Sequence, residues 1–123
     1  QPATAEGAEL DAEQLANRIA EIASDRKAID IRIIDVRSLV SYTDYLVVCS
    51  GNTERQTSAI RDAIHKELKD DHGLMTRRAE GASEARWILL DYLDCVLHVF
   101  TPDARDFYRL DKLWGDAPQR TVD

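Results

Sequence analysis

The chain has 123 residues, of which 44% are hydrophobic and 32% charged, the size and balance of one domain with a single core. Its net charge is −7 and its pI is near 4.9, which disfavours naked RNA as a partner and favours a basic protein. No apolar run approaches the roughly 18 residues of a membrane span, so we expect no membrane association.

Residues 1–9 carry no large apolar side chain, and we predict a disordered tail before a domain that spans residues 10–115. Asp11 and Gln14 have the spacing of a capping box. Apolar residues at helical intervals then predict a helix to about residue 27.

Two runs rich in branched apolar residues predict strands at residues 29–36 and 44–50, and the second run is typical of a central strand covered on both faces. Thr53 begins a second helix, which Gly73 ends. The remaining pattern predicts a short strand at 74–79, a hairpin of strands at 85–91 and 94–100, a helix at about 103–113 led by Pro102, and a polar tail at 116–123. The order αββαβββα indicates a single α/β domain with a mixed five-stranded sheet and flanking helices.

The predicted hairpin has one aliphatic face and one mixed face. Burial favours the register that joins the two aliphatic faces, because a slip of one residue would mix them. That register brings Trp87 close to His98 on the outward face. Tyr92 and Leu93 make a poor two-residue turn, since neither is glycine.

Amphipathic side chains concentrate in this hairpin and in the helix after it, although a small core does not require them. Tyr, Trp and Arg are enriched where protein surfaces bind each other. We therefore predict a recognition surface without catalytic residues, formed by Trp87, Asp91, Tyr92, His98, Arg105 and Tyr108. The competing interpretation is a second small core, covered by the last helix, that buries Trp87 without a partner.

No metal or cofactor is expected, because no His, Cys and Asp residues have ligand spacing. Cys49 and Cys95 lie within apolar runs, typical of buried free thiols in a reducing compartment. Gly51 stands between a strand and a helix, where phosphate can bind, but it lacks a nucleotide-binding fingerprint and a turn glycine is the simpler interpretation. A residual nucleotide-binding or nucleotidyltransferase enzyme that uses Gly51, Asp35 and Asp91 stays as an alternative, as does a homodimeric protein.

Nucleic acid is expected to bind weakly, because the densest basic group along the chain is only Arg77, Arg78 and Arg86. Residues 1–10 contain neither the basic nor the hydrophobic segment of a signal peptide. We expect a cytoplasmic protein, or one of an organelle matrix if a targeting segment has been removed.

The last third of the chain resembles the ribosomal silencing factor family (RsfS, also called Iojap). The residues that carry the resemblance are Glu80-Gly81, Trp87, Leu89-Leu90-Asp91-Tyr92, Val96 to Phe100 around His98, Arg105, Tyr108, Leu110 and Leu113-Trp114, with Asp44-Tyr45, Gly51 and Arg55-Gln56 upstream. Two residues depart from the family pattern: Leu93 stands where the family usually has a turn glycine, and Asp111 where it usually has Glu.

The resemblance implies a nucleotidyltransferase-like fold over residues 10–115. It also implies binding to the free large ribosomal subunit, through that subunit's fourteenth ribosomal protein, so that the small subunit cannot join and translation is repressed during starvation. Working enzymes of this fold carry a Gly-Ser helix start and paired carboxylates for divalent metal. Here Ser50-Gly51 has the reverse order and Asp35 stands alone on its strand, so we expect no enzymatic activity.

Overall fold

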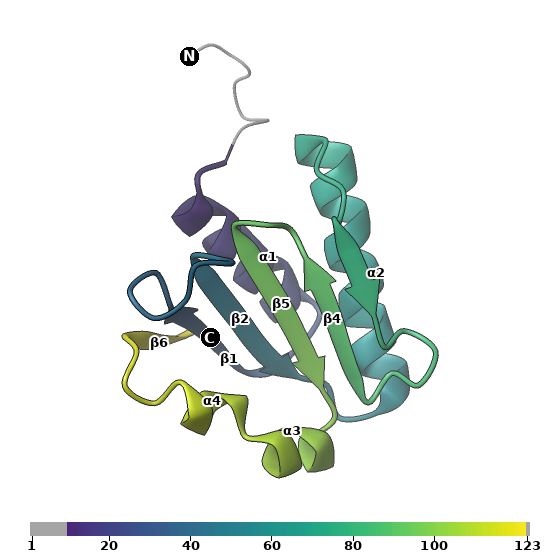
Figure 1. Ribbon diagram of the computed structural model, residues 1–123. Coiled ribbons are helices and arrows are strands. Elements are labelled where there is room, and N and C mark those ends of the chain that lie inside the picture. The colour runs from purple at the N-terminus through teal and green to yellow at the C-terminus, as the bar shows by residue number, and fades with distance from the viewer. Residues whose placement is uncertain (1–9, 123) are drawn as a thin grey trace.

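The computed structural model describes residues 10–122 and folds them around one six-stranded sheet of order β3-β4-β5-β2-β1-β6. β2 and β5 pair in parallel and the other described pairs are antiparallel. α1 and α2 lie together on one face, and α3 and α4 cross one end of the sheet (Figure 1). The elements are α1 (Ala12–Asp25), β1 (Ile29–Asp35), β2 (Tyr45–Ser50), α2 (Glu54–His72), β3 (Arg78–Glu80), β4 (Trp87–Asp91), β5 (Cys95–Phe100), α3 (Pro102–Tyr108), α4 (Leu110–Leu113) and β6 (Gln119–Val122).

This architecture confirms the predicted α/β domain with a mixed sheet and flanking helices, with six strands in place of five. The tail predicted at residues 1–9 lies outside the described residues.

The first two helices have the caps that the sequence predicts. The Asp11 side chain accepts the N–H of Gln14 at 2.7 Å, and the Gln14 side chain accepts the N–H of Asp11 at 3.0 Å. Thr53 caps α2 by accepting the N–H of Gln56 at 3.1 Å. Gly73 ends α2 with φ 66°, a left-handed conformation that glycine adopts without strain.

Apolar cores lie on both faces of the sheet. The main core, under α1 and α2, includes Ile19, Ile22, Ile31, Val47, Ile60, Ile64, Leu68, Leu90 and Leu97. The second core packs the opposite face against α3 and α4 and contains Ile34, Val36, Leu46, Val48, Val96, Phe100, Ala104 and Ala117. Because β2 contributes to both, all six of its residues are buried, which confirms the predicted central strand.

The hairpin of β4 and β5 has the predicted register, with Leu90 opposite Leu97. Its connection bends at Leu93, where φ is 76°, and the N–H of Asp94 donates to the carbonyl of Tyr92, two residues earlier. A γ-turn of this kind strains any residue other than glycine. Leu93 therefore adopts a conformation that glycine would adopt more easily.

Two predicted elements were wrong in extent. The strand predicted at 74–79 is β3 and begins later, because Leu74 follows the end of α2 and packs against the main core. The helix predicted at 103–113 is broken at Arg109, whose φ is 53°. This break redirects the chain so that Leu110 packs against the second core.

The polar tail predicted at 116–123 was also wrong, because residues 119–122 form β6. This strand pairs with β1 at the edge of the sheet, with Val122 opposite Ile31. Val122 packs against the main core, whereas Arg120 and Thr121 are exposed. A strand with so little apolar content has no alternating pattern that would predict it.

Candidate partner-binding site

An aromatic cluster lies where the hairpin meets α3. The ring centroid of Trp87 is 5.1 Å from that of Phe100 and 4.4 Å from that of Tyr108, and Tyr108 meets Phe107 edge-on at 5.0 Å. Phe100 is fully buried, Trp87 is half-buried, Tyr108 is 47% exposed and Phe107 is 77% exposed. We call Trp87, Phe107 and Tyr108 the aromatic ridge. Its rings rise from the second core toward solvent.

His98 orients the Trp87 ring of this ridge. The Nε1–H of Trp87 donates to Nδ1 of His98 at 3.0 Å, which confirms the predicted proximity of the two side chains. Burial lowers the pKa of His98 to about 4, so the imidazole is neutral near pH 7 and Nδ1 is free to accept. His98 thus fixes the orientation of Trp87 within the ridge.

Asp91 shares a face of β4 with Trp87 but lies four residues, or about 13 Å, along the strand. It is buried, pairs with Arg77 at 2.9 Å and accepts the N–H of Leu93 at 2.8 Å. Burial by itself raises the pKa of this carboxyl, but the hydrogen bonds from Arg77 and Leu93 outweigh burial and hold the pKa below its ordinary value. In the free chain Asp91 fixes the hairpin turn.

Tyr92 is not brought to the ridge. Its side chain is buried in the main core, on the helix side of the sheet, and burial raises its pKa to about 12. Its hydroxyl has no hydrogen-bond partner among the described residues.

Arg105 is also placed away from the ridge. It is only 9% exposed, and its guanidinium donates to the hydroxyl of Ser50 at 3.0 Å and to the carbonyl of Ile29 at 3.4 Å. These bonds fasten α3 to the ends of β1 and β2. Of the six predicted residues, the structure thus brings together Trp87, His98 and Tyr108.

Phe107 is the ridge residue that the sequence analysis missed. It is the most exposed of the large hydrophobic side chains described. The available signal was a pair of adjacent aromatic residues in a helix otherwise rich in charge, because a short helix cannot bury both. The competing interpretation of a second core is correct for Phe100, whereas Trp87 stays half-buried at the edge of that core.

The alternative of a residual enzyme requires Gly51, Asp35 and Asp91 to converge, and the sheet keeps them apart. Asp35 on β1 and Asp91 on β4 are three strand spacings apart, about 14 Å. Gly51 follows the opposite end of β2 from Tyr45, the residue that pairs with Asp35. A Cβ on Gly51 would lie 2.9 Å from the backbone nitrogen of Thr57, so glycine is needed here for close packing of α2.

Among the side chains that the structure describes, which exclude that of residue 111, no group of three or more His, Cys, Asp or Glu is placed to hold a metal ion. Within residues 10–122, none of the helices has the length and apolar content to cross a membrane. Cys49 and Cys95 are buried free thiols, as predicted, and burial raises the pKa of both.

Comparison with known proteins gives consistent matches along the chain. A family model described as ribosomal silencing factor during starvation matches residues 9–123. The chain is 41% identical over 104 residues to ribosomal silencing factor RsfS of Bacillus subtilis, covering 85% of this chain and 87% of that protein. It is 31% identical over 118 residues to a Mus musculus protein named mitochondrial assembly of ribosomal large subunit protein 1, covering 92% of this chain and 49% of that protein. A crystal structure of a Chromobacterium violaceum protein matches with a TM-score of 0.83 at 30% identity, covering 86% of this chain and 88% of that one.

The fold is a small α/β domain that carries an exposed aromatic ridge at the edge of its second core. Because the family model matches residues 9–123, nearly the whole chain, the chain belongs to the ribosomal silencing factor family. This confirms the resemblance carried by the hairpin and the helix after it.

Proposed function

We propose that the chain binds the free large ribosomal subunit and prevents the small subunit from joining it, which represses translation. The observation that carries this proposal is the aromatic ridge, because exposed aromatic side chains beside a half-buried Trp are the residue types of interface hot spots. The relatives support a ribosomal partner, since their names refer to ribosome silencing and to assembly of the large subunit.

The contact within the subunit is its fourteenth ribosomal protein, a basic protein. The net charge of −7 favours association with a basic surface and opposes contact with exposed phosphates. Trp87, Phe107 and Tyr108 make the contact, and His98 orients Trp87. Asp91, Tyr92 and Arg105 hold the structure of the free chain.

The mechanism is steric and requires no chemistry from the chain. A standard interface covers about 800 Å² of each partner. This is a small part of the 6743 Å² of accessible surface on the chain. The rest of the domain projects from the joining face and occupies space that the small subunit needs. The same mechanism operates in bacterial cytoplasm or in an organelle matrix.

Sedimentation of the chain with purified ribosomal particles tests this function. We expect the chain to sediment with free large subunits, and not with small subunits or intact ribosomes. Large subunits incubated with the chain should then fail to join small subunits. Normal joining, or equal retention on all three particles, would contradict the proposal.

A homodimer through the same ridge is the competing use of this surface. Analytical ultracentrifugation of the free chain, with and without large subunits, distinguishes the two. We expect any dimer to dissociate when large subunits are added, because both contacts need the ridge. A dimer that persists and excludes the subunit would favour the alternative.

A further inference from the structure

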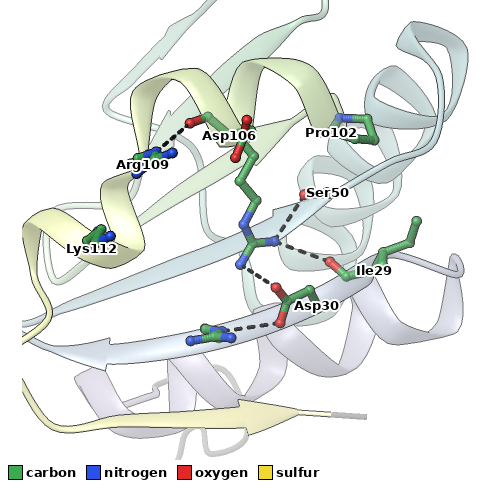
Figure 2. Close-up of a pocket in the computed structure, with 9 residues that line it drawn as sticks. Ile29, Asp30, Ser50, Pro102, Asp106, Arg109 and Lys112 are labelled. Atoms are coloured by element: carbon green, nitrogen blue, oxygen red, sulfur yellow. Dashed lines mark hydrogen bonds and ion pairs between the residues drawn. The ribbon is translucent and has the colours of Figure 1, made fainter.

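A cleft of about 480 Å³ opens between the start of β1, the end of β2 and the α3–α4 segment. Asp30 and Ser50 lie on its strand side, and Asp106, Arg109 and Lys112 on its helical side (Figure 2). Small-molecule sites have volumes of roughly 300–1,000 Å³, so this cleft has the size of a ligand site. No residue of the aromatic ridge lines it.

The cleft is basic although the chain is acidic. Its charged lining residues are the cations Arg32, Arg105, Arg109 and Lys112 and the carboxylates Asp30 and Asp106. Four positive charges face two negative ones, in a chain whose net charge is −7. The cations come from β1, from α3 and α4, and from the residue that joins these helices. Counting charges along the sequence therefore misses this group of four cations, because only the fold brings them together.

Two of the guanidinium groups are held in place by the protein itself. Arg105 is buried against Ser50 and the carbonyl of Ile29. The carboxylate of Asp30 lies 3.2 Å from Nε of Arg32 and 3.4 Å from Nη2 of Arg105, so it bridges both. Cations fixed in this way lose little conformational entropy when an anion binds.

The helical wall contributes two further cations. Nε of Arg109 donates to the carbonyl of Asp106 at 3.1 Å, which keeps this guanidinium beside the cleft. The described residues give Lys112 no ion pair, and its side chain is exposed. One guanidinium group can donate two parallel hydrogen bonds to phosphate oxygens, whereas an ammonium group binds phosphate as a point charge.

The position of the cleft in the sheet is also that of a ligand site. β2 leads into α2, which packs in the main core, whereas its parallel neighbour β5 leads into α3, which packs in the second core. The two connections thus leave on opposite faces. In open α/β sheets, ligands bind in the crevice outside the carboxyl ends of strands at such a point. Ser50, the last residue of β2, lines the cleft.

We propose that this cleft binds a small phosphorylated molecule of nucleotide size, whose phosphates contact Arg32, Arg105, Arg109 and Lys112. No covalent bond forms or breaks on binding. A small molecule fits the site better than RNA does, because the acidic remainder of the chain repels a long polyanion. The site is separate from the ridge and does not depend on the proposed ribosomal function.

Calorimetric titration of the intact chain with pyrophosphate, ATP and GTP, each with and without Mg²⁺, tests this site. Adenosine serves as the uncharged comparison and a short RNA as the polyanion. We expect saturable binding of the phosphorylated small molecules that weakens as salt is added, and no binding of adenosine. Absence of binding by every phosphorylated small molecule, or binding by RNA alone, would overturn the proposal.

Variants of exposed residues then locate the site. Lys112→Ala and Arg109→Gly should each weaken binding about tenfold, the loss of one hydrogen bond to a charged group. Glycine suits the φ of 53° at position 109. The matched control is Lys69→Ala. Lys69 is exposed and lies on α2, 15 residues, or roughly 22 Å, after the first residue of that helix. Denaturation curves confirm that each variant folds. Binding by Lys112→Ala equal to that of the control would overturn the assignment.

Discussion

The two faces of the sheet are covered by helices of very different length. α1 and α2, of 14 and 19 residues, cover the first face and bury Ile19, Ile60 and Ile64 completely. α3 and α4, of 7 and 4 residues, cover only part of the second face. They leave Phe107 and Leu113 exposed. A long amphipathic helix presents a continuous apolar stripe to a sheet, and a helix of one or two turns does not.

We expect this difference to divide stability from recognition. The apolar surface of the first face is buried within the chain, so we expect this face to supply most of the free energy of unfolding. The second face keeps aromatic surface in contact with solvent, and such surface marks interaction sites on soluble domains. Substitutions that differ only in their face should therefore change different measurements.

The largest expected effect is on the first face. Leu97→Ala should lower the free energy of unfolding by about 3 kcal/mol, because it leaves a cavity in the main core. Leu113→Ala removes the same atoms from a side chain that is 68% exposed, and should change stability by less than about 0.5 kcal/mol. Urea denaturation measures both. Equal losses would remove the distinction between the faces.

The next effect is on binding. Trp87→Ala should weaken association with large subunits by about 2 kcal/mol or more, the scale of a hot spot. Its cost in stability should be smaller than that of Leu97→Ala, since Trp87 is half-buried. Both quantities are measured on the same preparation. If the variant unfolds and its folded fraction still binds normally, Trp87 is a core residue and the partner binds elsewhere.

A pH dependence should follow from His98 beneath the ridge. Its pKa is about 4 in the folded chain against an ordinary 6.5, so the unfolded chain takes up the proton first. The free energy of unfolding should therefore fall as the pH decreases from about 6.5 to 4. His98→Gln keeps an acceptor for Trp87 but does not titrate, and should flatten this slope. An unchanged slope in urea denaturation across that range would show that other groups cause it.

The smallest expected effect is at the hairpin turn. Leu93→Gly should raise the free energy of unfolding by about 0.5–1 kcal/mol, because it relieves the left-handed backbone. Gly73→Ala is the reciprocal control and should lower it by about 1 kcal/mol, since φ is 66° there and no neighbour blocks the added methyl group. Thermal unfolding compares them. A loss of stability in Leu93→Gly would mean that the contacts of the leucine side chain stabilise the fold more than its backbone conformation destabilises it.

The same contrast explains what the sequence predicted. The helices of the first face begin and end at local signals, such as the capping box at Asp11 and the glycine at position 73. The burial of Arg105 has no such signal, because its partners Ser50 and Ile29 are 55 and 76 residues away in the chain. For the same reason the basic cleft was not predicted.

Tyr92 was a different kind of error. The alternation that places Trp87 outward also places residue 92 on the same side as Leu90, in the main core. Pattern alone was therefore sufficient to separate Tyr92 from the ridge. The interface composition of the hairpin outweighed the strand geometry in that prediction. The partner contacts of Trp87 and Tyr108 stay a prediction.

The central claim is that the aromatic ridge, and not the face covered by α1 and α2, holds the large subunit. Phe107→Asp tests it most directly, because Phe107 is 77% exposed and its replacement should leave the unfolding transition unchanged. Ala59→Asp, at an exposed position on α2, is the matched control on the other face. In co-sedimentation with free large subunits, we expect Ala59→Asp to bind as the unmodified chain does. We expect Phe107→Asp to stay folded and lose binding, because its charge would have to be desolvated in the interface. A folded Phe107→Asp variant that binds large subunits at full strength would contradict the account.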